Sequence, residues 1–259
     1  SALSTLGMNV NTGTETFTIN TKRTVNPEYF SFTTADAEYN VMNKIRNIPN
    51  ASYLLGNADF ALGIVTGNNK EYISDQKSES NEMVLKGADI SKYHINPTTN
   101  YIIFKPESFQ QIAPTEMYRA QEKLLYRFIS SQLVFAYDNK QTLSLNSCNI
   151  VIPKIPGIKM KYVLAILNSR IAQFIYKREF NSVKVLRSHI ENIPIPTVAE
   201  STQDNIIALT EKLISGLEIQ EAEKIYDELD ILVSQIFNLN SDEFEIIKKA
   251  VDGGNKFLA

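Results

Sequence analysis

Two acidic residues and a lysine form the clearest catalytic pattern in this sequence. Asp59, followed by Asp75 and Lys77, resembles the acidic pair and lysine with which nucleases hold Mg²⁺ and activate water. Asp138 and Lys140 repeat part of the same pattern. Such chemistry requires both acids on adjoining strands, whereas the serines around Lys77 predict a loop. A magnesium nuclease that uses Asp59, Asp75 and Lys77 is therefore an alternative and not the first interpretation.

The motifs of most other catalytic classes are absent from the sequence. Its ten glycines never form Gly-x-Gly, which excludes a dinucleotide loop and the glycine motif of methyl-donor binding, and there is no Walker loop. No two prolines are adjacent, which excludes the Asn-Pro-Pro-Tyr loop of amino-methyltransferases, and no Gly-x-Ser-x-Gly occurs. His94 and His189 have no second His or Cys at metal-ligand spacing, and Cys148 is the single cysteine. The sequence favours binding over catalysis.

The charge of the chain is divided between a basic body and an acidic tail. The net charge is −3, from 26 basic and 29 acidic residues. Residues 198–259 hold 13 acidic and 5 basic residues, so residues 1–197 hold 16 acidic and 21 basic ones. Residues 154–187 contain eight cations and a single acid, Glu179. A stretch of this kind attracts phosphates and releases their counterions, so it predicts an electropositive groove, although a solvated helix face is the alternative.

The elements that position these residues follow from hydrophobic periodicity. Short β-like runs separated by turn residues fill residues 62–152, and helical spacing marks residues 36–48 and 163–175. Asn168 and Ser169 interrupt the second helical stretch, and we expect them to cap a new helix. The two prolines within residues 193–196 predict an extended break. Beyond it the pattern is helical, with Asn240 and Glu243 as a capping box for the last helix.

These patterns predict an α+β protein of 259 residues in three parts. An N-terminal arm covers residues 1–24, and a recognition domain with a mixed or antiparallel sheet and flanking helices covers residues 25–197. An all-helical support segment covers residues 198–259, and its acidic surface would repel DNA, so we expect it to pack on protein. The single cysteine, the lack of a basic leader and the lack of a long apolar run predict a cytoplasmic protein without a membrane partner.

Several stretches of the sequence, in order, resemble a known family. They are Gly63-Ile64-Val65-Thr66-Gly67-Asn68-Asn69-Lys70, Leu85-Lys86-Gly87-Ala88-Asp89-Ile90-Ser91-Lys92-Tyr93, Lys123-Leu124-Leu125-Tyr126-Arg127, Leu164-Ala165-Ile166-Leu167-Asn168-Ser169 and Ile193-Pro194-Ile195-Pro196. Together they resemble the TaqI-like C-terminal specificity domain, the target-recognition domain of adenine-N6 DNA methyltransferases and of type IIG (Eco57I-like) restriction-modification enzymes. They are also similar to the specificity subunits of type I systems. The resemblance covers about residues 40–250.

The resemblance implies a domain of a prokaryotic protein that reads a short DNA sequence and positions the duplex for methylation of a flipped adenine. The catalytic half of such enzymes is absent from this chain, so the partners implied are double-stranded DNA and a methyltransferase domain or subunit. S-adenosylmethionine is then expected on that partner, and no cofactor is expected here. A magnesium nuclease and a protein-interaction scaffold built on the C-terminal helices are the alternatives, which salt-dependent DNA binding would distinguish.

Within this interpretation the exposed polar side chains receive separate roles. We expect Asn68 and Asn69 to bond adenine edges, and Arg127 to reach guanine or phosphate, although a hairpin turn and a structural ion pair are the alternatives. Lys177 and its neighbours are expected to hold the DNA backbone. The candidate DNA-contacting residues are Thr66, Asn68, Asn69, Lys70, Lys86, Lys92, Lys123, Arg127, Tyr137, Asn139, Lys177, Arg178, Lys184 and Arg187.

Overall fold

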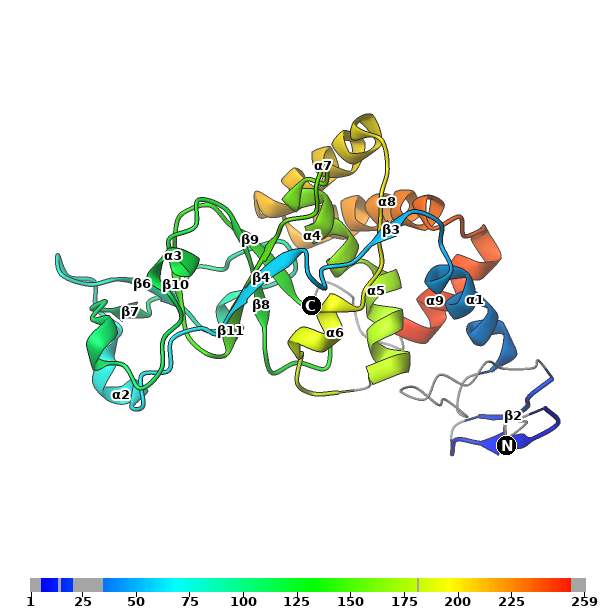
Figure 1. Cartoon of the computed structure of the whole chain (residues 1–259), viewed down its shortest axis with the longest axis horizontal. Helices are drawn as coiled ribbons and strands as arrows, with labels where there is room; N and C mark the ends of the chain where they lie inside the picture. Colours follow the sequence, from blue (N-terminus) through cyan, green and yellow to red (C-terminus); the bar gives the residue numbers. More distant parts are fainter. Residues whose placement is uncertain (1–5, 14, 21–34, 181, 253–259) are drawn as a thin grey trace.

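The computed structural model describes residues 6–13, 15–20, 35–180 and 182–252. Its long axis runs from a small sheet, through a central sheet, to a group of helices (Figure 1). The central sheet is antiparallel, with strand order β4-β11-β8-β9. Its strands are β4 (Ala58–Ala61), β8 (Lys123–Arg127), β9 (Phe135–Asp138) and β11 (Cys148–Pro153).

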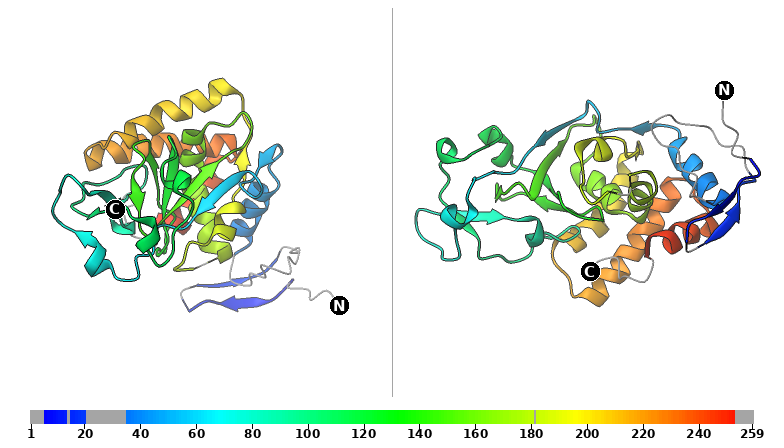
Figure 2. Two further views of the ribbon diagram at one scale, coloured as in Figure 1. Left: turned by 60° about the vertical axis from the view of Figure 1, so that its left-hand side comes forward. Right: turned by 90° about the horizontal axis from the view of Figure 1, so that it is seen from below.

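The small sheet lies on the side of the central sheet away from the helices (Figure 2). Its order is β10-β6-β7-β5, and only the β10–β6 pair is parallel. Its strands are β5 (Ile73–Ser74), β6 (Glu82–Leu85), β7 (Tyr101–Ile102) and β10 (Leu143–Ser144). Two further pairs are β1 (Asn9–Asn11) with β2 (Thr16–Thr18), and β3 (Ala51–Ser52) with β12 (Ile195–Pro196).

The longer helices lie at the other end of the molecule. They are α1 (Asp36–Arg46), α4 (Met160–Asn168), α7 (Glu200–Ile214), α8 (Ile219–Ile236) and α9 (Ser241–Asp252). Shorter helical turns are α2 (Asn69–Tyr72), η1 (Gly87–Asp89), η2 (Pro106–Ser108), α3 (Thr115–Tyr118), α5 (Arg170–Ile175), the π-helical η3 (Tyr176–Phe180) and α6 (Arg187–Glu191). Helix α7 packs on both α4 and α8, and α9 packs on α1 and α5.

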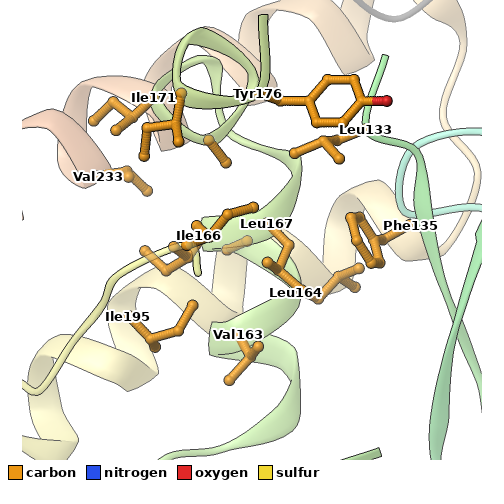
Figure 3. Packing of buried hydrophobic residues seen from close by; sticks show 14 of the residues in the cluster. Leu133, Phe135, Val163, Leu164, Ile166, Leu167, Ile171, Tyr176, Ile195 and Val233 are labelled. Carbon is orange, nitrogen blue, oxygen red and sulfur yellow. The ribbon is translucent and has the colours of Figure 1, made fainter. Parts of the chain in front are cut away.

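Hydrophobic alternation along β8 gives the protein a core on each face of the central sheet. Leu124 and Tyr126 join the larger core with the helices, whereas Leu125 joins the smaller core with the small sheet. Figure 3 shows the larger core, in which side chains of α4 and α5 meet Phe135 of β9 and Val233 of α8. Both faces of the sheet are therefore covered.

The Leu-Asn-Ser motif of α4 has a structural role. The side chain of Asn168 accepts a hydrogen bond from the backbone N–H of Phe135 (3.0 Å) and donates one to its carbonyl (2.9 Å). It thereby continues the ladder along the free edge of β9, and buried backbone groups require such partners. The Ser169 hydroxyl accepts from the N–H of Ala172 (3.1 Å), so the predicted cap of a second helix is confirmed.

The predicted elements agree with most of the structure. The helix predicted over 36–48 is α1, and the capping box is confirmed because Asn240 and Glu243 exchange side chain-to-backbone hydrogen bonds of 2.8 and 2.9 Å. Within the β-like region predicted over 62–152, residues 69–72 form the helical turn α2 instead. The strands β3 and β4 lie before that region and were not predicted, because strands this short show no clear period.

The proline-containing break is extended, as predicted, but it is buried. Ile195 and Pro196 form β12, and neither side chain is exposed. The larger core includes Val41 of α1, Ile166 of α4 and Leu229 of α8, so the helical segment shares its core with the preceding domain. Packing of the acidic tail within its own chain is confirmed. Part of the predicted N-terminal arm, and residues 25–34 of the predicted domain, lie outside the described residues.

Candidate nucleic-acid interface

The basic stretch 154–187 does not form the predicted electropositive groove, because most of its cations are paired with acids. Lys159 contacts Glu200 (2.8 Å) and Asp204 (2.7 Å) of α7, and Lys161 contacts Glu211 (2.6 Å). The remaining pairs are Lys154 with Asp59, Arg178 with Glu38 (2.6 Å), Arg187 with Glu191 (2.7 Å) and Arg170 with Asp227 (2.8 Å), Asp230 (2.9 Å) and Asp252 (3.0 Å). Acids of the tail thus pair with Lys159, Lys161 and Arg170, and acids elsewhere in the chain pair with Lys154, Arg178 and Arg187.

Lys177 and Arg178 also hold helices together. The Lys177 ammonium donates to the carbonyl of Ala250 in the last turn of α9 (2.7 Å), and Arg178 reaches Glu38 in the first turn of α1. A cation at a helix C-terminus and an acid at a helix N-terminus both complement the helix dipole. These contacts give Lys177 and Arg178 a structural role, and their predicted contact with the DNA backbone stays a prediction.

Lys123 is fully buried, which contradicts its predicted contact with DNA. Its ammonium donates to Asp138 (2.5 Å) and to the carbonyl of Tyr118 (2.7 Å), and both charged side chains have 0% exposure. Alternation along β8 does put Lys123 and Arg127 on one face, but the small sheet covers that face.

Lys92 and Tyr137 are also buried. Lys92 lies near Asp230 and Arg170, and burial lowers the pKa of its ammonium well below the ordinary value. The Tyr137 hydroxyl donates to Glu122, and the Lys161 ammonium lies 5.1 Å from the centre of its ring. Neither side chain presents its polar group to a duplex in this conformation, so these two predictions are wrong.

Arg127 fixes a loop at one end of β8. Its guanidinium donates to the carbonyls of Gly87 (2.9 Å) and Ile90 (2.6 Å), which brace η1. Half-buried Lys86 donates to the side chain of Asn100 (2.6 Å) in the same loop region. A Cβ on Gly87 would lie 2.5 Å from the carbonyl oxygen of Ser147, so only glycine fits here. Arg127 thus has a structural role, as the alternative predicted, but its partners are backbone carbonyls and not an acidic side chain.

The exposed candidates include those in residues 66–70, which we call the tip loop. Asn68, Asn69 and Lys70 are exposed, and Lys70 has no ionic partner among the described residues. Thr66 is buried and donates to the side chain of Asn69 (2.6 Å), and Gly67 has a φ of +83°, which favours glycine. The loop is therefore a defined turn that presents two amides and an ammonium to solvent.

A second exposed group lies where residues 128–130 pair with residues 183–185. Ser130 N–H donates to the Val183 carbonyl (3.0 Å) and Val185 N–H to the Phe128 carbonyl (2.8 Å). We call residues 127–132 and 182–190 the basic ladder, because they contain Arg127, Lys184 and Arg187 and no acidic residue. Exposed Lys184 has no ionic partner in the described part of the chain. Exposed Asn139 lies apart, at the far end of β9.

The tip loop and the basic ladder are separate exposed groups. In Figure 1, α2, which overlaps the tip loop, lies at the small-sheet end, and α6, which overlaps the basic ladder, lies near the middle of the molecule. On the ladder side, the contacts of Arg127 join the end of β8 to Gly87, itself hydrogen-bonded to Ser147 (3.0 Å). The tip loop, Lys184 and Arg187 form the candidate interface.

The sequence analysis missed the exposed apolar members of this surface. Ile129 and Val183 are 54% and 67% exposed, although their types predict burial. The absence of acids from both segments of the ladder was a sequence signal for a basic surface. The pairing of these two segments, more than fifty residues apart, could not be predicted from the periodicity.

The geometry of a metal-dependent nuclease is absent from the described residues. Asp59 lies on β4 in the central sheet and contacts Lys154, whereas Asp75 follows β5 in the small sheet. Lys77 donates to the carbonyl of Asn81. Within the described ranges no three His, Cys, Asp or Glu side chains group as metal ligands. His94 packs at the end of α7, and His189 stacks on Phe180 with ring centres 4.4 Å apart.

Comparison with known families identifies the class of domain. Residues 82–195 match the TaqI-like C-terminal specificity domain. The match includes β8, β9, β11, α4 and α5, so this part of the chain is similar to a TaqI-like specificity domain. The resemblance inferred from the motifs is confirmed. No curated protein matches the chain by sequence.

Solved structures show the same fold. The type IIG restriction endonuclease BpuSI is similar with a TM-score of 0.52 and 12% identity, over 84% of this chain and 32% of that enzyme. The type IIL restriction-modification enzyme MmeI, solved in complex with DNA, gives a TM-score of 0.50 and 10% identity, over 74% of this chain and 35% of that enzyme. This chain thus spans about a third of either enzyme, and the predicted α+β fold class is confirmed.

Proposed function

We propose that this chain is the DNA sequence-recognition module of a restriction-modification adenine-N6 methyltransferase, which binds duplex DNA and positions it for a catalytic domain outside this sequence. The observation that carries the proposal is the match of residues 82–195 to a specificity domain. A related fold occurs in MmeI, which was solved with DNA. Binding, rather than turnover, is the task assigned to this chain.

The tip loop and the basic ladder are the proposed contact surface. Amide side chains such as those of Asn68 and Asn69 can pair with adenine edges, and Lys70, Lys184 and Arg187 can hold phosphates. Arg127 acts indirectly in this proposal, by bracing the loop at Gly87. The deeply buried candidates support the fold instead.

The partners proposed are double-stranded DNA and a methyltransferase domain or subunit, which would carry S-adenosylmethionine. Type IIG organisation is proposed from the similarity to BpuSI. Cytoplasmic location follows from such a function and is proposed with it. No helix in the described part of the chain is long and apolar enough to cross a membrane.

Selection from random DNA tests this function. The full chain is incubated with a duplex library containing a randomised central segment, bound DNA is amplified, and the cycle is repeated. We expect a short sequence motif to be enriched, and the enriched duplex to bind more weakly as salt rises, because phosphate contacts release counterions. Failure to retard any duplex at low salt would refute the proposal.

The same measurement distinguishes the alternatives. A protein-interaction scaffold would show no salt-dependent DNA binding. A magnesium nuclease would cleave plasmid in Mg²⁺, and Asp75→Ala would abolish that cleavage. Lys224→Ala, on the acidic helix α8, is the control that should leave DNA binding unchanged.

A further inference from the structure

Large apolar side chains project into solvent from the basic ladder. Ile129 is 54% exposed, Val183 67% and Leu186 41%. The surrounding backbone is defined by the two ladder hydrogen bonds, and His189 accepts from the Leu186 N–H (3.2 Å). Large apolar side chains held in solvent by a defined backbone point to a contact with a partner.

The ladder places an apolar side chain beside a cation. Ile129 and Lys184 are directly opposite in an antiparallel bridge. Opposite residues project to the same side with Cβ atoms about 5 Å apart. Arg187 is fixed nearby, because its guanidinium lies 5.0 Å from the ring centre of Phe60 and donates to Glu191 (2.7 Å).

The charge around these apolar groups favours a polyanion as their partner. Within the ladder, Arg127 is bound to backbone carbonyls and Arg187 pairs with Glu191 just beyond it, so exposed Lys184 is the cation without an ionic partner in the described residues. The contrasting case is α8, where Ile231 is also exposed (49%) but five acids and one base occupy the same helix. An exposed isoleucine on an acidic helix does not suit DNA, whereas one beside Lys184 does.

We infer that Ile129 and Val183 contact the bases and sugars of bound duplex DNA, while Lys184 holds an adjacent phosphate. Proteins that combine cations with protruding Ile or Leu side chains contact DNA in this way. The inference rests on the proposed function and extends it, because it assigns the salt-independent part of DNA binding to named apolar residues.

Salt dependence separates the two kinds of contact. Each phosphate contact contributes about 0.9 to the slope of log affinity against log salt, whereas an apolar contact contributes to affinity but not to the slope. On the duplex enriched by the full chain, Ile129→Ser with Val183→Ser should weaken binding about tenfold at every salt concentration, with the slope unchanged. Lys184→Ala should reduce the slope by about one.

Matched variants guard against indirect effects. Ile231→Ser removes an equally exposed isoleucine from α8 and should leave affinity unchanged. Ile129→Leu with Val183→Ile keeps the apolar surface and should retain wild-type affinity. Thermal unfolding of each variant checks that the exposed substitutions leave the fold intact.

Two results would overturn the inference while leaving the proposed function standing. One is wild-type affinity of the double serine variant on the enriched duplex. The other is a double serine variant that binds the enriched duplex normally but, once a catalytic partner is added, supports less methylation than wild type. That result would assign the patch to a protein contact. Failure of the wild-type chain to enrich any duplex would refute both proposals together.

Discussion

At the scale of single residues, burial decides which cations are available to DNA. Lys123 and Lys184 have the same chemistry, but the first is buried against Asp138 and the second is exposed without an ionic partner in the described ranges. A buried ion pair is costly to break because the remaining partner is an uncompensated charge. The two lysines should therefore respond to substitution in opposite ways.

Lys123→Met should lower the free energy of unfolding by about 3–5 kcal/mol, because it leaves the buried Asp138 carboxylate without its cation. Urea unfolding monitored by circular dichroism measures the change. Lys140→Met, two residues beyond Asp138 and exposed, is the matched control and should change stability by less than about 0.5 kcal/mol. Comparable stability of the two variants would contradict this assignment.

Asp230 should make stability depend on pH. Burial raises the pKa of its carboxyl from 3.8 to about 6, although Arg170 opposes the shift. Between these values the folded chain holds a proton that the unfolded chain releases, so this group's contribution to stability is present below about pH 4 and is lost as pH rises to about 6.

The Asp230→Asn variant has no carboxyl at this position, so its stability should not fall for this reason between about pH 4 and pH 6. Relative to the variant, wild type should lose up to about 3 kcal/mol in free energy of unfolding across this range. Urea unfolding at several pH values measures it. Asp227→Asn serves as the control, because Asp227 contacts the same arginine but is largely exposed. A parallel pH profile for wild type and Asp230→Asn would exclude the effect.

At the scale of elements, side chains from one helix hold the ends of others. Lys177 and Arg178 leave η3 to reach the carbonyl end of α9 and the N-terminal turn of α1. The ladder between residues 128–130 and 183–185 then fixes the chain that follows η3. Within the basic stretch, Lys177 and Arg178 therefore stabilise the helices, whereas nearby Lys184 is a residue proposed to contact DNA.

Lys177→Ala combined with Arg178→Ala should lower the free energy of unfolding by about 1–3 kcal/mol, through loss of two charge-assisted hydrogen bonds. The affinity of the folded fraction for DNA should remain near that of wild type. Chemical unfolding and gel retardation measure the two effects. Lys184→Ala should show the reverse combination, and identical behaviour of both variants would contradict the division between support and contact.

At the scale of the whole molecule, the central sheet separates two cores and the acidic helices complete the larger one. Val233 of α8 packs against the α4 and α5 region (Figure 3), and α7 contacts both α4 and α8. The helical segment is therefore part of the recognition domain's interior, and its acids compensate the basic stretch at the same time.

A chain that ends at residue 197 should lose cooperative thermal unfolding, because truncation exposes the buried residues of α4. Differential scanning calorimetry and near-ultraviolet circular dichroism test this. Adding residues 198–259 as a separate chain should restore the transition. A cooperative transition in the truncated chain alone would show that the helical segment is dispensable for folding.

The sequence by itself determined the local elements and the class of domain. Hydrophobic periodicity predicts α1, β8, α4 and the C-terminal helices, because each element buries one face. The capping hydrogen bonds of Ser169 and Asn240 are also local, since they join residues no more than four positions apart. The order of the motifs was sufficient to indicate a specificity domain, since the family match covers residues 82–195.

Only the tertiary structure decided which charges face solvent. Arg170 meets acids 57, 60 and 82 positions away, and no local pattern encodes such pairings. The small sheet buries Lys123 although alternation alone left its face open, and the ladder exposes Ile129 although its type predicts a core position. Whether a charged side chain is exposed or paired depends on which distant segments pack beside it. Those segments come together when the helices and the small sheet pack on the two faces of the central sheet.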